Sequence, residues 1–68
     1  MKEISISTEF IKLDQFLKFT GCAQNGAEAK MLVLDGKAYV NGEIERRRGR
    51  KLRPGDIISF QNEEFTIV

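Results

Sequence analysis

The pattern of apolar and polar residues at the start of the chain predicts a short strand followed by a helix. In "EISIS", residues 3–7, two isoleucines alternate with polar neighbours, which is the period of a half-buried strand. Further on, Leu13, Phe16 and Leu17 recur at the spacing that places them on one face of a helix. We expect this helix to run to about Phe19, because Gly21 is suited to the backbone conformation that ends helices.

A second helix is predicted from about Ala27. Asn25 is a candidate N-cap, and Gly36 stands where a left-handed residue after the last turn is wanted. The helix would bury a stripe of three apolar residues: Ala29, Leu32 and Val33.

The second half of the chain has the pattern of strands and tight turns. In "AYVNGEI", residues 38–44, Asn41 and Gly42 tolerate the positive φ values of a type I′ hairpin turn. In "RPGD", residues 53–56, Pro54 and Gly55 take the positions that a type II turn prefers. These two turns divide the region into short strands.

A last hairpin is expected from "IISF" and "FTIV", with the polar "QNEE" of residues 61–64 as its turn. The chain has no repeat and no long linker. We therefore predict one α+β domain over residues 1–68, in which two short helices pack on a small, mainly antiparallel sheet.

Composition limits the chemistry that this domain can perform. It has 68 residues, one cysteine and no histidine, which excludes an internal disulfide and leaves no plausible zinc site. No segment has the length and hydrophobicity of a membrane span, and the start lacks the apolar core of a signal peptide. We expect a cytoplasmic, monomeric protein without a cofactor.

Catalytic residues are hard to find in this sequence. Cys22 has no recognisable base and is expected to be a small core residue. Glu63 and Glu64 are expected in a solvated turn, and no glycine motif for phosphate binding occurs. The sequence therefore predicts a protein that is not an enzyme.

Charge is distributed unevenly. Residues 37–53 hold seven basic and two acidic side chains, a local charge of +5, while the rest of the chain carries −4. Such a division is typical of a nucleic-acid-binding face opposite an acidic, solvated back. Arg46, Arg48 and Arg50 would share one face if the strand before them continues, although Gly49 leaves the register beyond it open.

The stretches "KLDQFLKFTG", "AEAKMLVLDGKAYVNGEI" and "KLRPGDII" resemble the S-four RNA-binding domain, also called the alpha-L motif. The resemblance covers about residues 11–60 and is greatest to the stand-alone bacterial subgroup often called YaaA-like or YbcJ-like. It implies a surface that recognises structured RNA, with ribosomal RNA or a ribosomal particle as the expected partner.

The resemblance also implies particular contact residues. Lys12 matches the basic residue before Leu-Asp, and Lys30 matches the basic residue of the second helix. The sequence departs from the family at Gly26 and Ala27, where many members have arginine and serine. Together with the charge cluster, the predicted RNA-binding residues are Lys12, Lys30, Lys37, Arg46, Arg47, Arg48, Arg50, Lys51 and Arg53.

Several alternatives stay open at this point. Lys18 suits a solvated helix face as well as an RNA contact, and Tyr39 is expected to pack in the sheet rather than to stack on a base. A protein-interaction module that keeps the RNA-binding fold is the second functional hypothesis, and hydrolytic or transfer chemistry is a distant third.

Overall fold

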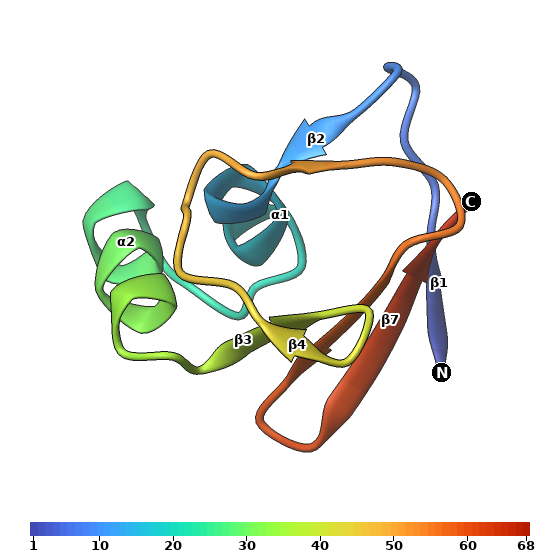
Figure 1. Cartoon of the computed structure of the whole chain (residues 1–68). Coiled ribbons are helices and arrows are strands. Elements are labelled where there is room, and N and C mark those ends of the chain that lie inside the picture. The colour runs from blue at the N-terminus through green and yellow to red at the C-terminus, as the bar shows by residue number, and fades with distance from the viewer.

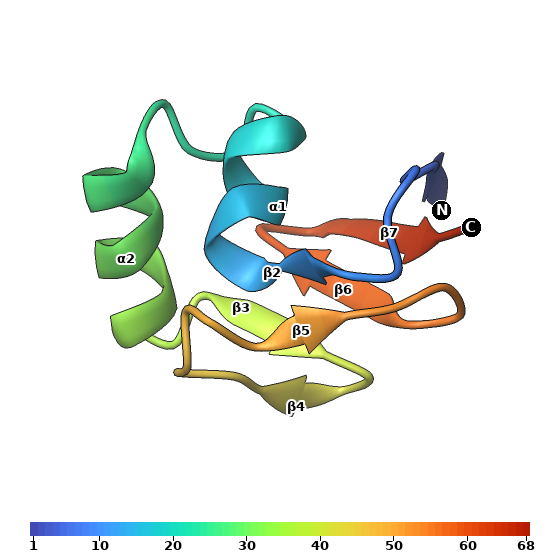
Figure 2. The same ribbon diagram turned by 90° about the horizontal axis from the view of Figure 1, so that it is seen from above.

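Two helices lie against one face of a five-stranded sheet, and a two-stranded ribbon lies beside them (Figures 1 and 2). The computed structural model describes all residues 1–68. Its elements in chain order are β1 (Lys2–Ile4), β2 (Ile11–Lys12), α1 (Leu13–Phe19), α2 (Gly26–Leu34), β3 (Ala38–Val40), β4 (Glu43–Ile44), β5 (Lys51–Leu52), β6 (Ile57–Phe60) and β7 (Glu63–Ile67).

The sheet is mixed, with strand order β1-β7-β6-β3-β4. Its first pair, β1 with β7, is parallel, and the other three pairs are antiparallel. Alternate residues of β3, β6 and β7 point toward the helices, as the period of a strand requires. The predicted α+β fold with a mainly antiparallel sheet is confirmed.

Both predicted helices form, and they bury the expected faces. In α1 the buried residues are Leu13, Phe16 and Leu17, and the ring of Phe16 meets that of Phe65 in β7 edge to face, with centroids 5.5 Å apart. This contact joins the helix layer to the sheet. Gly21, just after α1, has a positive φ of 81°, as expected for a residue that ends a helix.

Capping fixes the position of α2. The side chain of Asn25 accepts a hydrogen bond from the backbone N–H of Glu28 (2.8 Å), and Glu28 in turn accepts one from the N–H of Gln24. Gly36 has a positive φ beyond the helix end. The predicted N-cap and helix end are both confirmed.

The two turns predicted from glycine have the expected geometry. Asn41 and Gly42 have φ values of 52° and 87°, and they join β3 to β4 in a two-residue hairpin. Gly55 has φ of 99°, and the N–H of Asp56 donates to the carbonyl of Arg53 (2.9 Å), which closes the type II turn.

The turn of the last hairpin was predicted incorrectly. It consists of Gln61 and Asn62, which both have positive φ, and the strand register pairs Phe60 with Glu63. Because a two-residue turn is sufficient, Glu63 and Glu64 belong to β7. Glu63 also forms a surface ion pair with Lys2 of β1 (2.8 Å).

The ribbon of β2 and β5 was not predicted as a pair of strands. Ile11 pairs with Leu52, and Lys12 pairs with Lys51. Leu52 is completely buried in the core, so it anchors this part of the chain. The pairing brings Lys12 next to Lys51, although the two lysines are distant in the sequence.

Candidate nucleic-acid interface

Residues 45–53 form a connection between β4 and the Pro54–Gly55 turn, and we call them the basic segment. The strand ends at Ile44, so the condition under which Arg46, Arg48 and Arg50 would share one face is not met. Instead the chain turns at residues 47–50, where the N–H of Arg50 donates to the carbonyl of Arg47 (3.1 Å).

Backbone hydrogen bonds fix the basic segment to the start of α1. The N–H of Leu13 donates to the carbonyl of Arg50 (2.8 Å), and the N–H of Asp14 donates to that of Arg48 (3.0 Å). The helix needs these acceptors because its N-cap residue, Lys12, provides no side-chain hydrogen bond. The shape of the basic segment is therefore set by the helix as well as by its own turn.

A buried carboxylate lies under the arginines. Glu45 is 8% exposed, and its oxygens accept hydrogen bonds from Nε and Nη2 of Arg47 (3.0 and 3.1 Å) and from Nη1 of Arg50 (2.7 Å). The backbone N–H of Arg47 donates to it as well. The hydrogen bond from the Arg47 side chain is the main cause that lowers the pKa of Glu45 to about 2, with Arg50 adding to the effect and burial opposing it.

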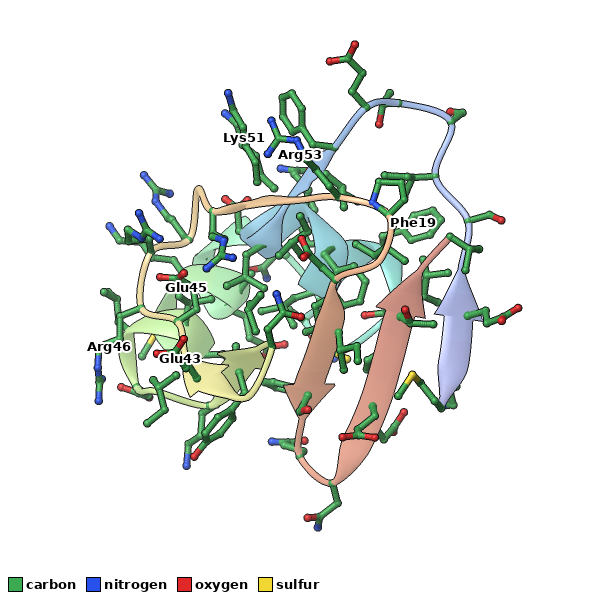
Figure 3. The ribbon with its side chains drawn as sticks, turned by 45° about the vertical axis from the view of Figure 1, so that its right-hand side comes forward. Phe19, Glu43, Glu45, Arg46, Lys51 and Arg53 are labelled. Carbon is green, nitrogen blue, oxygen red and sulfur yellow. The ribbon has the colours of Figure 1, made fainter.

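The side chain of Arg46 binds α2 and not Glu45. Its Nη1 donates to the carbonyl of Leu34 at the end of α2 (2.8 Å), and its guanidinium packs against Gly36. A cation at a helix C-terminus is favourable because the unpaired carbonyls there carry partial negative charge. Figure 3 shows Arg46 far along the basic segment from Lys51 and Arg53.

The other end of the basic segment includes β5, one strand of the β2–β5 ribbon. Lys12 and Lys51 are directly opposite each other in the antiparallel pair, so their side chains project from the same face. Neither lysine has a carboxylate partner. Nζ of Lys51 lies 4.8 Å from the centroid of the Phe10 ring, and the guanidinium carbon of Arg53 lies 5.7 Å from it.

A groove of about 480 Å³ runs along this surface. It is lined by the side chains of Arg47, Arg50, Lys51 and Arg53 and by Gly49, without any acidic or apolar residue. A groove with this lining is chemically suited to an anion with several oxygen acceptors, such as a phosphate group.

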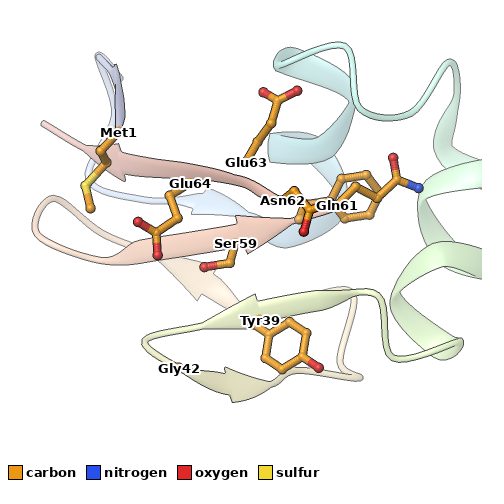
Figure 4. A pocket seen from close by; sticks show the side chains of 9 residues that line it. Met1, Tyr39, Gly42, Ser59, Gln61, Asn62, Glu63 and Glu64 are labelled. Atoms are coloured by element: carbon orange, nitrogen blue, oxygen red, sulfur yellow. The ribbon is translucent and has the colours of Figure 1, made fainter.

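Another part of the surface differs in charge. A hollow of about 620 Å³ on the outer face of the sheet includes Glu63, Glu64, Ser59 and Tyr39 in its lining but no basic residue (Figure 4). Tyr39 lies in the sheet, as expected, but its side chain is 40% exposed on this outer face. The alternation of β3 explains this, since its neighbours Ala38 and Val40 take the inward positions.

The structure thus gathers some of the predicted site residues and separates others. Arg47, Arg50, Lys51 and Arg53 line one groove, and Lys12 adjoins it through its pairing with Lys51. Four more predicted residues lie outside the groove lining: Lys30 in α2, Lys37 before β3, Arg46, which binds the end of α2, and Arg48, whose exposed side chain has no bonded partner.

Glu45 and Phe10 also shape this surface, although neither was among the predicted residues. The position of Glu45 directly before a run of arginines was a local signal for an ion pair, because its carboxylate can reach the side chains of nearby arginines. Phe10 had no such signal, because its contacts depend on the pairing of β2 with β5.

Other kinds of site receive no support from the arrangement of side chains. No group of three His, Cys, Asp or Glu residues could hold a metal ion. Cys22 is half-buried, packs against the core and accepts a hydrogen bond from the hydroxyl of Thr20 (3.2 Å). None of the helices has the length and apolar character to cross a membrane.

Comparison with known proteins bears on this basic surface. The family model described as "S4 domain" matches residues 4–68, almost the whole chain. The chain belongs to the S4 domain family. This is the family that the sequence motifs indicated.

Relatives of this S4 domain include two bacterial proteins of similar length. The probable ribosome maturation protein RlbA of Bacillus subtilis is 45% identical over 58 residues, which cover 85% of this chain and 82% of RlbA. The putative RNA-binding protein YbcJ of Escherichia coli is 31% identical over 58 residues, which cover 85% of this chain and 83% of YbcJ.

The solution structure of YbcJ, described as revealing an alfaL motif involved in RNA-binding, has a TM-score of 0.73 to this S4 domain at 29% sequence identity. The match covers all of this chain and 87% of the YbcJ chain. The shared fold includes both helices and the sheet that position the basic surface.

Proposed function

We propose that this S4 domain binds structured RNA through the groove of the basic segment and the adjoining β2–β5 ribbon. The observation that carries the proposal is the Lys12–Lys51 pair, two opposed cations without a carboxylate partner. Lys51 also lines a groove together with three further basic side chains. Like charges directly opposite in a sheet are destabilising, and the phosphates of a nucleic acid relieve that repulsion.

The nine predicted contact residues take different parts in this proposal. Lys12, Lys51 and Arg53 provide charge without a competing carboxylate, and Arg48 is similarly free. Arg47 and Arg50 bind phosphate with the N–H groups that Glu45 leaves unused. Lys30, Lys37 and Arg46 make peripheral contacts, and Arg46 does so with a guanidinium already bonded to α2.

The expected RNA is structured and is part of ribosomal RNA or of a ribosomal particle. A rigid basic surface suits the regular phosphates of a helix, and the groove lining contains no aromatic residue on which unpaired bases could stack. The ribosomal assignment is supported by the name of the RlbA relative. We propose that the protein acts as a cytoplasmic monomer without catalysis.

Binding of a short RNA duplex, measured by fluorescence anisotropy at several salt concentrations, tests the proposal. Lys51→Gln and Lys12→Gln should each weaken binding and lower the slope of log affinity against log salt by roughly 0.7 to 0.9. Lys2→Gln is the matched control, since it removes one positive charge at the far edge of the sheet, where Lys2 pairs with Glu63.

The control separates a localised surface from the effect of net charge. We expect Lys2→Gln to bind nearly as well as the wild type. Equal losses in all three variants would contradict the proposed location, and a wild type that binds no duplex RNA would contradict the function itself.

A further inference from the structure

The groove contains two kinds of cation. Lys51 and Arg53 have no carboxylate partner, whereas Arg47 and Arg50 are both bonded to Glu45. Arg47 uses Nε and Nη2 for this contact, and Arg50 uses Nη1. Each guanidinium therefore keeps further N–H groups, including Nη1 of Arg47 and Nη2 of Arg50, that can donate to a ligand.

Simple electrostatics would make Glu45 harmful to phosphate binding, since it is a negative charge beside the groove. Two other properties act in the opposite direction. Its charge is already compensated by two arginines, so the three side chains together remain cationic. It also restricts two long side chains that would otherwise lose rotamer freedom when RNA binds.

The backbone adds to this restriction. The Glu45 carboxylate accepts a hydrogen bond from the backbone N–H of Arg47 in addition to those from the Arg47 side chain. The basic segment is also fixed to α1 through the carbonyls of Arg48 and Arg50. Both ends of the Arg47 and Arg50 side chains are thus held, at the backbone and at the guanidinium. Preorganised donors of this kind bind an anion without a further ordering cost.

We propose that Glu45 is a positioning residue that holds Arg47 and Arg50 ready to bind one backbone phosphate of the RNA in the groove. The inference rests on the proposed RNA-binding function and extends it, because it assigns a favourable role to an acidic residue within the basic surface. It predicts that removing this negative charge weakens the binding of a polyanion.

The test compares Glu45→Gln with Glu43→Gln. Both substitutions raise the net charge by one, but Glu43 is exposed in β4 and its side chain makes no hydrogen bond or ion pair. In the duplex-binding assay Glu45→Gln should bind roughly fivefold to tenfold more weakly than the wild type, as expected when two side chains lose their restraint. Glu43→Gln should bind equally well or slightly better.

The salt dependence distinguishes positioning from a general loss of stability. At a temperature where circular dichroism shows that the variant is folded, Glu45→Gln should lower the log–log salt slope by roughly one phosphate contact, or 0.7 to 0.9. In a background that already carries Arg47→Gln and Arg50→Gln, the same substitution should cause no loss of affinity.

Glu45→Asp provides a second variant in case Glu45→Gln does not fold. It keeps the charge but shortens the side chain, so it should weaken binding without any change in net charge. Equal affinity of Glu45→Asp and the wild type, or of Glu45→Gln and Glu43→Gln, would overturn the inference while leaving RNA binding itself intact. Absence of wild-type binding would instead contradict the proposed function.

Inorganic phosphate could bind the same N–H groups as a phosphate of the RNA backbone. In RNA-free protein, inorganic phosphate replacing chloride at equal ionic strength should leave the thermal midpoint unchanged, because the proposed ligand is held by contacts along an RNA backbone. A rise in the midpoint that disappears in Glu45→Gln would reassign the groove to free phosphate and overturn its assignment to RNA.

Discussion

Two buried side chains of opposite character hold the basic segment in place. Leu52 is 0% exposed and joins the apolar core, and Glu45 is 8% exposed and binds two arginines. The exposed cations between them owe their positions to these inward-pointing neighbours. At the residue scale, the surface chemistry therefore depends on groups that a ligand does not reach.

Leu52→Ala should lower the free energy of unfolding by roughly 2 to 5 kcal/mol, because it removes a completely buried side chain and leaves a cavity. Urea denaturation monitored by circular dichroism measures the change. Arg48→Ala is a suitable control, since its side chain is exposed and unpaired and its loss should change stability by less than about 0.5 kcal/mol. A Leu52→Ala variant as stable as the wild type would contradict the anchoring role.

Acid should destabilise the protein partly through Glu45. Its pKa is lowered from 4.5 to about 2 in the folded state, so its contribution to stability is complete above pH 4.5 and is lost as the pH falls toward 2. Urea titrations between pH 6 and pH 2 should show a steeper loss of stability for the wild type than for Glu45→Gln, which has no group to protonate at this position. Parallel curves would show that the carboxylate is not bound as described.

At the scale of elements, tight turns determine which residues face each other across the sheet. Asn41–Gly42 was predictable because few residues other than Asn and Gly adopt two successive positive φ values at low cost. The turn at Gln61–Asn62 was placed wrongly because glutamine gives a weak signal for such geometry. The pairing of β2 with β5 had no local signal, since each strand has two residues and the partners are distant in the chain.

Asn41→Val together with Gly42→Val should destabilise the β3–β4 hairpin by roughly 1 to 3 kcal/mol for each strained residue. Both positions have positive φ, which β-branched residues resist. The substitution also removes hydrogen bonds between the Asn41 side chain and residues 56 and 57. A thermal midpoint unchanged from that of the wild type would contradict this assignment.

Gly26→Ala serves as the control for that experiment. Gly26 begins α2, has no positive φ, and leaves open space where a Cβ would lie. We expect it to leave stability unchanged or to raise it slightly, because alanine favours a helix more than glycine does.

At the scale of the whole molecule, two surface depressions differ in the charge of their lining. The groove of the basic segment has no acidic lining residue, and the hollow on the outer face of the sheet has no basic one. The charge count along the sequence predicted such a division. It did not predict that Arg46 binds α2 or that Glu45 binds Arg47 and Arg50, because these contacts depend on how the chain turns after β4.

The protein should bind duplex or hairpin RNA more tightly than an unstructured strand of equal length. Its basic surface is fixed by buried contacts, so it matches phosphates at regular positions better than those of a flexible chain. Competition in the anisotropy assay at constant salt compares the two RNA classes directly. Equal or tighter binding of the unstructured strand would contradict the preference.

The hydrogen bonds from Leu13 and Asp14 to the basic segment have a consequence for the dynamics of the protein. These two amide hydrogens belong to a helix, but their protection from exchange with solvent depends on carbonyls of Arg50 and Arg48. Hydrogen exchange at the first turn of α1 therefore reports the opening of a loop that is distant in the sequence. A ligand that holds this loop closed should slow the exchange of both amides without touching either of them.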